Sequence, residues 1–112
     1  MPRAATTSDV FNAIAEPRRR AIFELLCESD RVVGDVADAL GLDQPSVSKH
    51  LRVLREVELV AVTREGRHRV YSARPEALAP VATWVNRWEK LWDDQLRRIR
   101  DAAERRARGG PR

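Results

Sequence analysis

The sequence predicts a mainly α-helical fold with one small β-hairpin, and three patterns lead to this prediction. Residues 33–59 contain two short amphipathic helical patterns separated by Gly41. Residues 59–72 contain two β-branched runs around Gly66, and residues 76–106 carry one long apolar stripe at helical spacing. The chain has 112 residues, which is enough for one domain with its own core.

The first two helices are expected to meet at Pro17. The first begins near Ser8 and ends before this proline, because the residue that precedes a proline avoids the helical conformation. Its apolar side consists of Val10, Phe11, Ile14 and Ala15. The second helix begins at Pro17 and turns Ile22, Leu25 and Leu26 inward. We expect Cys27 beside them to be a small core residue rather than a redox group.

Three arginines, Arg18, Arg19 and Arg20, occupy the first turn of the second helix. Cations at a helix N-terminus are unfavourable to the helix dipole. Two interpretations remain open. The arginines form a solvated helix start, or they clamp a DNA phosphate, with Arg18 as the candidate contact.

Residues 33–59 predict two helices joined by a tight turn. In the first, Val33, Val36, Ala37 and Leu40 recur at the spacing of one buried face. Gly41 supplies the left-handed residue that ends this helix, and Asp43 can accept from the free N–H groups of the next one. In the second helix Val47, Leu51 and Leu54 face inward, with Leu59 rather than Glu58 as the last anchor. This arrangement is a helix-turn-helix.

The outer face of the second helix is polar and basic, as recognition of a DNA major groove requires. Short polar groups come first and cations follow: Gln44, Ser46, Ser48, Lys49, Arg52 and Arg55. Gln can pair with adenine and Lys with guanine, so the N-terminal half of this helix is expected to read base edges. His50 on the flank either hydrogen-bonds a phosphate or holds the helix against its neighbour.

Residues 59–63 and 68–72 are β-branched runs, and the glycine between them predicts a hairpin. The hairpin carries four basic residues, Arg64, Arg67, His68 and Arg69. A basic hairpin directly after a recognition helix is the wing of a winged helix, and its cations are expected to hold the DNA backbone or minor groove. Residues 31–33 are also extended and apolar enough to form a short strand.

Pro75 and Pro80 open a long last helix that reaches about Arg106. Its apolar stripe includes Val81, Trp84, Val85, Trp88, Leu91, Trp92, Leu96, Ile99, Ala102 and Ala103. One winged-helix core is too small to cover a stripe of this length, and a second copy of the same chain is the commonest covering surface. We therefore expect a dimer interface at Val81, Trp84, Val85, Trp88, Trp92, Leu96 and Ile99. The tryptophans could instead line a small-molecule pocket.

The expected organisation is a disordered tail at 1–6, a DNA-binding core at 7–75, a dimerisation helix at 76–106 and a frayed end at 107–112. Lys and Arg number 21 and Asp and Glu 17, and the net charge of +4 suits a polyanionic partner. The single cysteine excludes an internal disulfide and fits a reducing compartment. No long apolar run or signal-peptide core is present, so we expect a soluble, cytoplasmic protein without a membrane partner.

With these elements in place, the sequence resembles the ArsR/SmtB-type winged-helix repressors over about residues 8–106. The resemblance rests on EPRRRAIFELL, VADALGLDQPSVSKHLRVLREVELV and TREGRHRVYSA, in this order and spacing. It implies a homodimer built on the first and last helices, which adds Phe11 to the interface. It also implies a partly palindromic operator, repression of transcription in the usual case, and release by an effector that the sequence does not identify.

Metal ligands are the point at which this sequence departs from that family. Many metal-sensing members carry a Cys-x-Cys pair where this sequence has Val32 and Gly34, and others bind zinc through Asp and His of the last helix. Here the two histidines, His50 and His68, lie in the reading helix and the wing. Zinc requires several converging ligands, so we expect a metal-independent member without a cofactor, of the branch with a tryptophan-containing last helix.

Two other functional classes are weighed against a DNA-binding repressor. A winged-helix module that docks a protein would carry an acidic or apolar outer face, whereas the face here is polar and basic. An enzyme is not expected, because the sequence lacks a glycine-rich phosphate loop, a nucleophile with a base and a ligand cluster. Within the repressor class, one alternative remains open: release by a small apolar ligand bound near the tryptophans.

Overall fold

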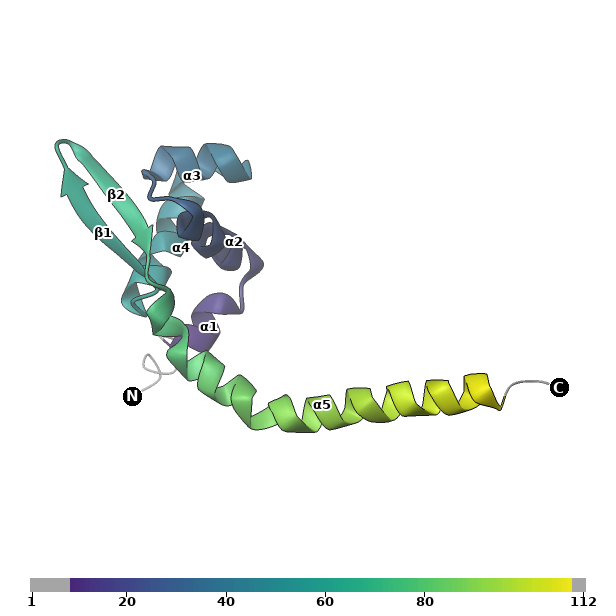
Figure 1. Cartoon of the computed structure of the whole chain (residues 1–112). Helices are drawn as coiled ribbons and strands as arrows, with labels where there is room; N and C mark the ends of the chain where they lie inside the picture. The colour runs from purple at the N-terminus through teal and green to yellow at the C-terminus, as the bar shows by residue number, and fades with distance from the viewer. Residues whose placement is uncertain (1–8, 110–112) are drawn as a thin grey trace. The chain divides into compact units, whose positions relative to one another are not determined.

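The computed structural model describes residues 9–109, which form helices and one two-stranded antiparallel sheet in the arrangement of a winged helix-turn-helix (Figure 1). The predicted fold class is therefore confirmed. The chain divides after Pro80 into two units. The first contains α1 to α4, the hairpin and a short 3₁₀-helix, and the second is the long helical segment that follows.

Helix α1 (Val10–Ile14) is short and is capped by Asp9, whose carboxylate accepts the N–H of Asn12 at 2.7 Å. Ser8, where the helix was expected to begin, lies outside the described residues. Of the predicted apolar side, Val10 is buried, whereas Phe11 is 40% exposed and Ala15 is exposed; the buried Ala13 was not predicted. A helix of five residues packs along a single ridge against α2 and α4, and that ridge is the i, i+3 pair.

Helix α2 (Pro17–Glu28) shows that the arginines at its start act within the protein. Glu16 caps the helix by accepting the N–H groups of Arg18 and Arg19. The Arg19 guanidinium donates to the carbonyl oxygens of Ala13 (Nε, 2.7 Å) and Asn12 (Nη2, 3.1 Å), and that of Arg20 donates to Ile14 (Nη1, 2.7 Å). These carbonyls lie at the C-terminus of α1, where a helix leaves acceptors without intrahelical donors. That of Asn12 also accepts the backbone N–H of Ala15 at 3.2 Å. Two of the three arginines therefore join α1 to α2, a role that neither open interpretation included.

Cys27 is exposed on the outer side of α2, so the expectation that it belongs to the core is wrong. Its neighbour Leu26 takes the inward position together with Ile22 and Phe23. Partial desolvation of the sulfur and the negative charge of Glu24 raise the pKa of the Cys27 thiol. The thiol is therefore protonated at neutral pH, which lowers its reactivity.

The expected strand at residues 31–33 reduces to a single bridging residue. Arg31 exchanges backbone hydrogen bonds with Tyr71 at 3.0 and 2.8 Å, and Val33 already begins helix α3 (Val33–Leu40). The helix forms here because its apolar spacing buries Val36 and Ala37 on one face.

The helix-turn-helix forms as predicted between α3 and α4 (Gln44–Glu56). Gly41 ends α3 in the left-handed region with φ of 66°. Asp43 caps α4: one carboxylate oxygen accepts the N–H of Ser46 at 3.0 Å and the other accepts its hydroxyl at 2.8 Å. Both the left-handed glycine and the aspartate cap are confirmed.

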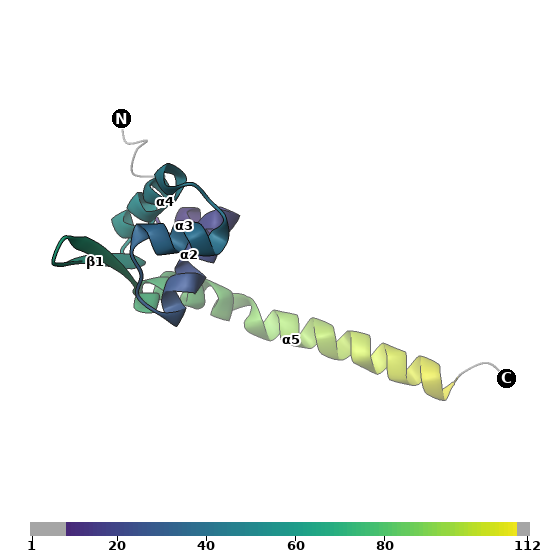
Figure 2. The same cartoon turned by 90° about the horizontal axis from the view of Figure 1, so that it is seen from above.

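The core of the first unit lies under the inner face of α4. Val47, Leu51 and Leu54 are at most 1% exposed, and α4 packs against both α2 and α3 (Figure 2). After α4 the chain turns through Glu58, a non-glycine residue with a positive φ of 64°. The Leu59 N–H donates to the Leu54 carbonyl at 3.0 Å, and the Leu59 side chain is fully buried as the expected anchor.

The wing consists of β1 (Val60–Glu65) and β2 (His68–Ala73), paired antiparallel with Val62 opposite Tyr71. Strand β1 extends two residues further toward the tip than expected, whereas β2 begins at His68 as predicted, so that the turn contains Gly66 and Arg67 alone. Gly66 has a φ of 64°, which a tight hairpin turn requires. The 3₁₀-helix η2 (Pro75–Leu78) follows the wing.

Helix α5 (Ala79–Arg108) carries the second unit from Val81 onward. Its stripe residues from Val85 to Ile99 are exposed, and Trp84 and Trp88 pack edge to face with ring centroids 6.3 Å apart. Residues 107 and 108, expected in the frayed end, are helical. Residues 110–112 and the expected tail at 1–6 lie outside the described residues.

The two hydrogen bonds of the Arg19 guanidinium to α1 predict that the arginines contribute unequally to stability. We expect Arg19→Ala to lower the free energy of unfolding by about 1–3 kcal/mol, because it leaves two carbonyl oxygens of α1 without a charged donor. Arg18→Ala removes a 3.5 Å ion pair with Glu16 at an exposed site and should change stability by less than about 1 kcal/mol. Urea unfolding at one fixed protein concentration measures the free energy of unfolding of both variants. Equal losses in the two would contradict the role of Arg19 in joining α1 to α2.

Candidate nucleic-acid interface

A groove lies between α4 and the wing strand β2, and it gathers most of the predicted DNA-binding residues of the wing and of the second half of α4. It consists of two adjoining hollows of about 230 and 360 Å³ that share Ser48, Arg69 and Tyr71. The first is completed by Arg52 and Arg55 and the second by Val32, Val33, Gly34, Arg67 and His68. We call the surface lined by these residues the wing groove.

Secondary structure explains why these side chains converge. Ser48, Arg52 and Arg55 are four and three residues apart on α4 and therefore share one helix face. Arg69 and Tyr71 are two residues apart on β2 and therefore share one face of the hairpin. The Arg31–Tyr71 bridge brings β2 to the start of α3, which adds the third wall.

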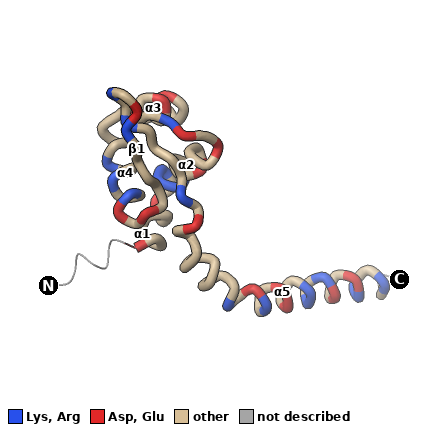
Figure 3. The backbone as a smooth tube through the Cα atoms, turned by 60° about the vertical axis from the view of Figure 1, so that its left-hand side comes forward, with Lys and Arg blue, Asp and Glu red and all other residues tan. Residues whose placement is uncertain are grey.

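The wing groove is electropositive. Four arginines and a histidine line it, and no acidic residue is among its lining residues in the described chain. Figure 3 shows the Lys and Arg positions along α4 in blue. Converging guanidinium groups bind phosphate oxygens well, because each presents several donors in a fixed plane.

The polar residues at the start of α4 lie outside the wing groove. The Ser46 hydroxyl already has a hydrogen-bond partner within the protein, because it donates to Asp43. Gln44 lies against α3, where a methyl group on Gly34 would come within 3.5 Å of its Nε2 atom. Lys49 is exposed on the outer side of the helix.

His50 faces the start of α2 rather than the wing. Partial burial lowers the pKa of its imidazole; Glu16 opposes this effect, whereas the nearby cations Arg19, Arg18 and Lys49 add to it. The neutral ring is therefore favoured at neutral pH. Of the two interpretations of His50, this position favours contact with the neighbouring helix.

Arg18 and Arg64 are also separate from the wing groove. Arg18 lies 3.5 Å from Glu16, whose pKa is lowered: desolvation alone would raise it, but the N–H donors of Arg18 and Arg19 outweigh that effect. Arg64 is on β1, directly opposite Arg69. As contacts to DNA, all of these residues remain predictions.

Sequence reasoning missed Tyr71 and the start of α3 as parts of the site. Tyr71 is buried and forms the floor shared by both hollows. The spacing of Arg69 and Tyr71 in the sequence could have indicated it, since residues two apart on a strand share a face.

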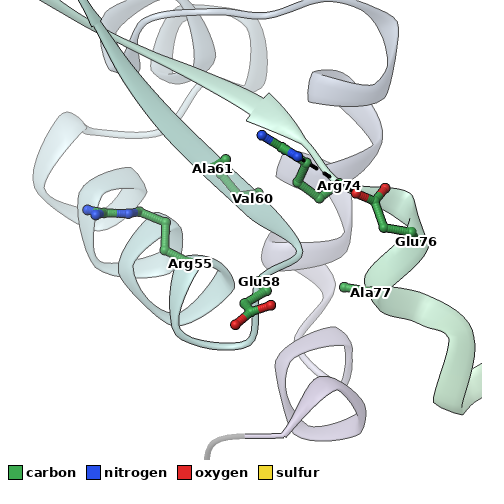
Figure 4. A pocket seen from close by; sticks show the side chains of 7 residues that line it. All are labelled: Arg55, Glu58, Val60, Ala61, Arg74, Glu76 and Ala77. Carbon is green, nitrogen blue, oxygen red and sulfur yellow. Dashed lines mark ion pairs between the residues drawn. The ribbon is translucent and has the colours of Figure 1, made fainter.

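A third hollow of about 410 Å³ lies at the base of the wing (Figure 4). Arg74 and Glu76 point toward one another there as an ion pair at 3.8 Å, and Glu58 lies on the other side of the hollow. Because its lining carries both signs of charge, this hollow lacks the uniform potential of the wing groove.

Metal-ligand groups and membrane-spanning helices bear on the expected cofactor and partners. Among residues 9–109 no group of three or more His, Cys, Asp or Glu side chains is placed to hold a metal ion. Over the same residues, no helix has both the length and the apolar character needed to cross a membrane.

The fold and the wing groove together define a winged helix-turn-helix protein of the DNA-binding kind. The family model described as "Bacterial regulatory protein, arsR family" matches residues 16–62. The Transcriptional repressor SdpR of Bacillus subtilis (strain 168) is 33% identical over 89 residues, which cover 80% of this chain and 99% of that protein. The chain therefore belongs to the ArsR family of transcriptional regulators.

Other relatives agree with this assignment. The HTH-type transcriptional regulator Rv2034 of Mycobacterium tuberculosis is 38% identical over 78 residues, 70% of this chain and 73% of its own. An ArsR-like transcriptional regulator from Rhodococcus sp. RHA1 superposes with a TM-score of 0.66 at 27% identity, covering 92% of this chain and 97% of its own. A homodimeric winged helix-turn-helix DNA-binding domain from Mycobacterium bovis gives 0.59 at 31% identity, over 72% and 75%.

The cap of α4 predicts a pH dependence of folding. The hydroxyl and N–H of Ser46 lower the pKa of Asp43, so the folded state favours the carboxylate. This stabilisation is complete above the unfolded pKa and is lost as the pH falls through the folded value. We expect Asp43→Asn, which keeps a capping oxygen, to match the wild-type melting temperature near pH 7, and Asp43→Ala to melt lower.

Below about pH 5 the wild type should lose thermal stability relative to Asp43→Asn, because only the wild-type cap can be protonated. Circular dichroism melts of the three proteins from about pH 7 down to about pH 3 measure this. A difference between wild type and Asp43→Asn that stays constant with pH would show that Asp43 is not the titrating cap.

Proposed function

We propose that this chain is a homodimeric transcriptional repressor that binds a partly palindromic DNA operator without a metal cofactor. The observation that carries the proposal is the wing groove, where five basic side chains from α4 and the hairpin converge without an acidic neighbour among the lining residues. Membership in the ArsR family and the similarity to the transcriptional repressor SdpR support the same proposal.

The two parts of the interface are expected to perform different tasks. The N-terminal half of α4 presents Gln44, Ser48 and Lys49, and recognition helices meet base edges with this half. The wing presents Arg64, Arg67 and Arg69, which would contact the backbone and supply affinity rather than sequence choice. The wing groove fits a phosphate between the two.

Dimerisation would come from α5 and Phe11. The exposed stripe residues Val85, Trp88, Leu91, Trp92, Leu96 and Ile99 are 41–64% exposed. A contiguous apolar surface of this kind marks an interface. Two-fold symmetry would then place two recognition helices about one DNA turn, or a multiple of it, apart. The homodimeric neighbour from Mycobacterium bovis supports this arrangement.

Metal independence is proposed from the residue content. Val32 and Gly34 at the start of α3 offer no side-chain ligand, and the last helix contains no histidine or cysteine. We place the regulator in the cytoplasm, because its proposed partner, the operator DNA, is there.

Substitution of one residue in each part should separate specificity from affinity. We expect Lys49→Ala to cost about 1–3 kcal/mol on the operator and to relax the preference at one base step per half-site. Arg67→Ala should weaken all sequences alike and lower the salt slope by about 1 per subunit. Titrations with operator and with random-sequence DNA at several salt concentrations measure these effects.

The wild-type titrations are repeated with excess chelator and with added zinc. The operator affinity should be the same in both conditions if binding needs no metal and is not released by one.

Three outcomes of these titrations would contradict parts of the proposal. If Arg67→Ala changes base preference and Lys49→Ala does not, the roles of wing and helix are reversed. If stoichiometric zinc releases the operator about tenfold or more, the protein senses metal. If neither variant binds DNA differently from wild type, the wing groove is not the interface.

The dimer proposal makes its own prediction. Trp88→Ala combined with Trp92→Ala should shift the protein toward monomer and weaken operator binding far more than nonspecific binding, because paired half-sites reinforce each other only in a dimer. Lys90→Ala, on the opposite side of α5, is the matched control and should leave both unchanged. Sedimentation and operator titration decide this, and a double variant that stays dimeric at micromolar concentration would contradict it.

A further inference from the structure

The hollow at the base of the wing lies wholly within the first unit and has a volume of about 410 Å³ (Figure 4). This volume falls within the range of small-molecule sites in proteins, about 300–1,000 Å³. We call it the base hollow. Its lining comes from the end of α4, the start of β1 and the start of η2: Arg55, Glu58, Val60, Ala61, Arg74, Glu76 and Ala77.

Glu58 is an unusual residue for its place in the backbone. The N–H of Glu58 donates to the Arg55 carbonyl, and that of Leu59 donates to the Leu54 carbonyl, both at 3.0 Å. These two bonds form a Schellman motif, whose left-handed position is usually a glycine. Glu58 holds this position with a φ of 64°, and a carboxylate at a helix C-terminus also opposes the helix dipole. Local structure therefore disfavours glutamate here on two grounds, and a backbone outlier of this kind points to a functional role.

The charges that line the base hollow are only partly paired. Figure 4 shows Arg74 and Glu76 on the η2 side, where they form the 3.8 Å ion pair. Arg55 and Glu58 lie on the α4 side, and within residues 9–109 neither side chain has a hydrogen-bond or ion-pair partner. One cation and one anion thus line the same side of the hollow without meeting each other.

This arrangement selects the charge of a ligand. A singly charged ligand would be attracted by one of the two unpaired groups and repelled by the other. A zwitterion satisfies both, with its ammonium at Glu58 and its carboxylate at the planar guanidinium of Arg55. Val60 is buried, and Ala61 and Ala77 are half-buried, so the lining between the charged groups is apolar. An apolar side chain on the ligand would contact this part.

Arg55 also connects the base hollow to the wing groove. It lines the base hollow together with Glu58, and it lines the first hollow of the wing groove together with Arg52 and Arg69. One guanidinium cannot bind a ligand carboxylate in the first place and a DNA phosphate in the second at the same time. A ligand in the base hollow therefore competes with DNA for Arg55, and the two affinities are lowered reciprocally.

We propose that the base hollow binds a small zwitterion, an α-amino acid with an apolar side chain, between Glu58 and Arg55, and that the bound ligand weakens DNA binding by withdrawing Arg55 from the wing groove. The site itself stands on the geometry of the base hollow. Its effect on DNA rests on the proposed function.

Calorimetric titration of the full chain without DNA tests the site. Each standard L-amino acid is titrated in turn, and we expect those with apolar side chains to bind with a Kd below about 1 mM. L-leucine has two matched analogues: 4-methylpentanoate lacks the ammonium, and 3-methylbutylamine lacks the carboxylate. Each analogue should bind at least about tenfold more weakly than L-leucine, because it leaves one of the two charges unsatisfied.

Glu58→Gln locates the ligand in the base hollow. The substitution removes the charge and keeps the size of the side chain, so the fold should be retained while the affinity for the amino acid falls at least about tenfold. Glu56→Gln is the matched control, because it removes the same charge from an exposed residue of α4 that does not line the hollow. This control should bind the amino acid as the wild type does.

Operator titrations with and without a saturating amino acid test the effect on DNA. For the wild type we expect the operator affinity to fall about fivefold or more, and the salt slope to fall by about 1 per subunit, because one phosphate contact is lost. Glu58→Gln should bind the operator as Glu56→Gln does, and the amino acid should leave its operator affinity unchanged.

Four outcomes would overturn a part of this account. If no amino acid binds the free chain, or if Glu58→Gln binds it as tightly as Glu56→Gln does, the base hollow is not the site. Equal binding of L-leucine and either analogue would exclude recognition of a zwitterion. Operator affinity and salt slope that do not change with a bound amino acid would refute competition for Arg55. A chain that binds the amino acid through Glu58 but binds no DNA would confirm the site and refute the proposed function instead.

Discussion

Burial of the inner face of α4 is the constraint on which the rest of the first unit depends. Val47, Leu51 and Leu54 are at most 1% exposed, and both α2 and α3 pack against the helix that carries them. Because an α-helix has 3.6 residues per turn, fixing these positions inward turns Ser48, Arg52 and Arg55 outward. The buried Leu59 then fixes the start of β1, so the wing groove follows from the packing of one helix.

Charged side chains maintain this small core as much as they prepare its surface. Asp9, Glu16 and Asp43 each cap a helix N-terminus, and Arg19 and Arg20 bind the C-terminal carbonyls of α1. Short helices depend on such partners because they leave a large share of their backbone groups unpaired. A count of basic residues therefore overstates the surface available to DNA, since part of the positive charge is used within the fold.

The sequence was informative where structure is local and less so where it depends on distant partners. Gly41 and Asp43 predicted the helix-turn-helix because a left-handed glycine and an aspartate cap act within a few residues. Cys27 was misplaced because Ile22, Phe23 and Leu26 take the inward positions of α2, which turns residue 27 toward the outside. Residues 31–33 fit a strand or a helix start equally well. The spacing of Tyr71 and Arg69 places both on one strand face, but the contact of that face with the start of α3 depends on the bridge between Tyr71 and Arg31, which the sequence does not show.

The distribution of charge, rather than its total, distinguishes the two units. On α5, Asp94 lies 3.9 Å from Lys90 and 3.1 Å from Arg97, so cations and anions of the same helix offset each other on its polar side. In the wing groove no acidic residue lines the hollows that hold the arginines. Cations gathered in this way repel one another in the free protein, and a bound polyanion would relieve that repulsion. The wing groove therefore lowers the stability of the free protein somewhat, and a bound anion would restore it. On α5, by contrast, the charges offset each other, so the exposed apolar stripe is the surface through which this helix would bind a partner.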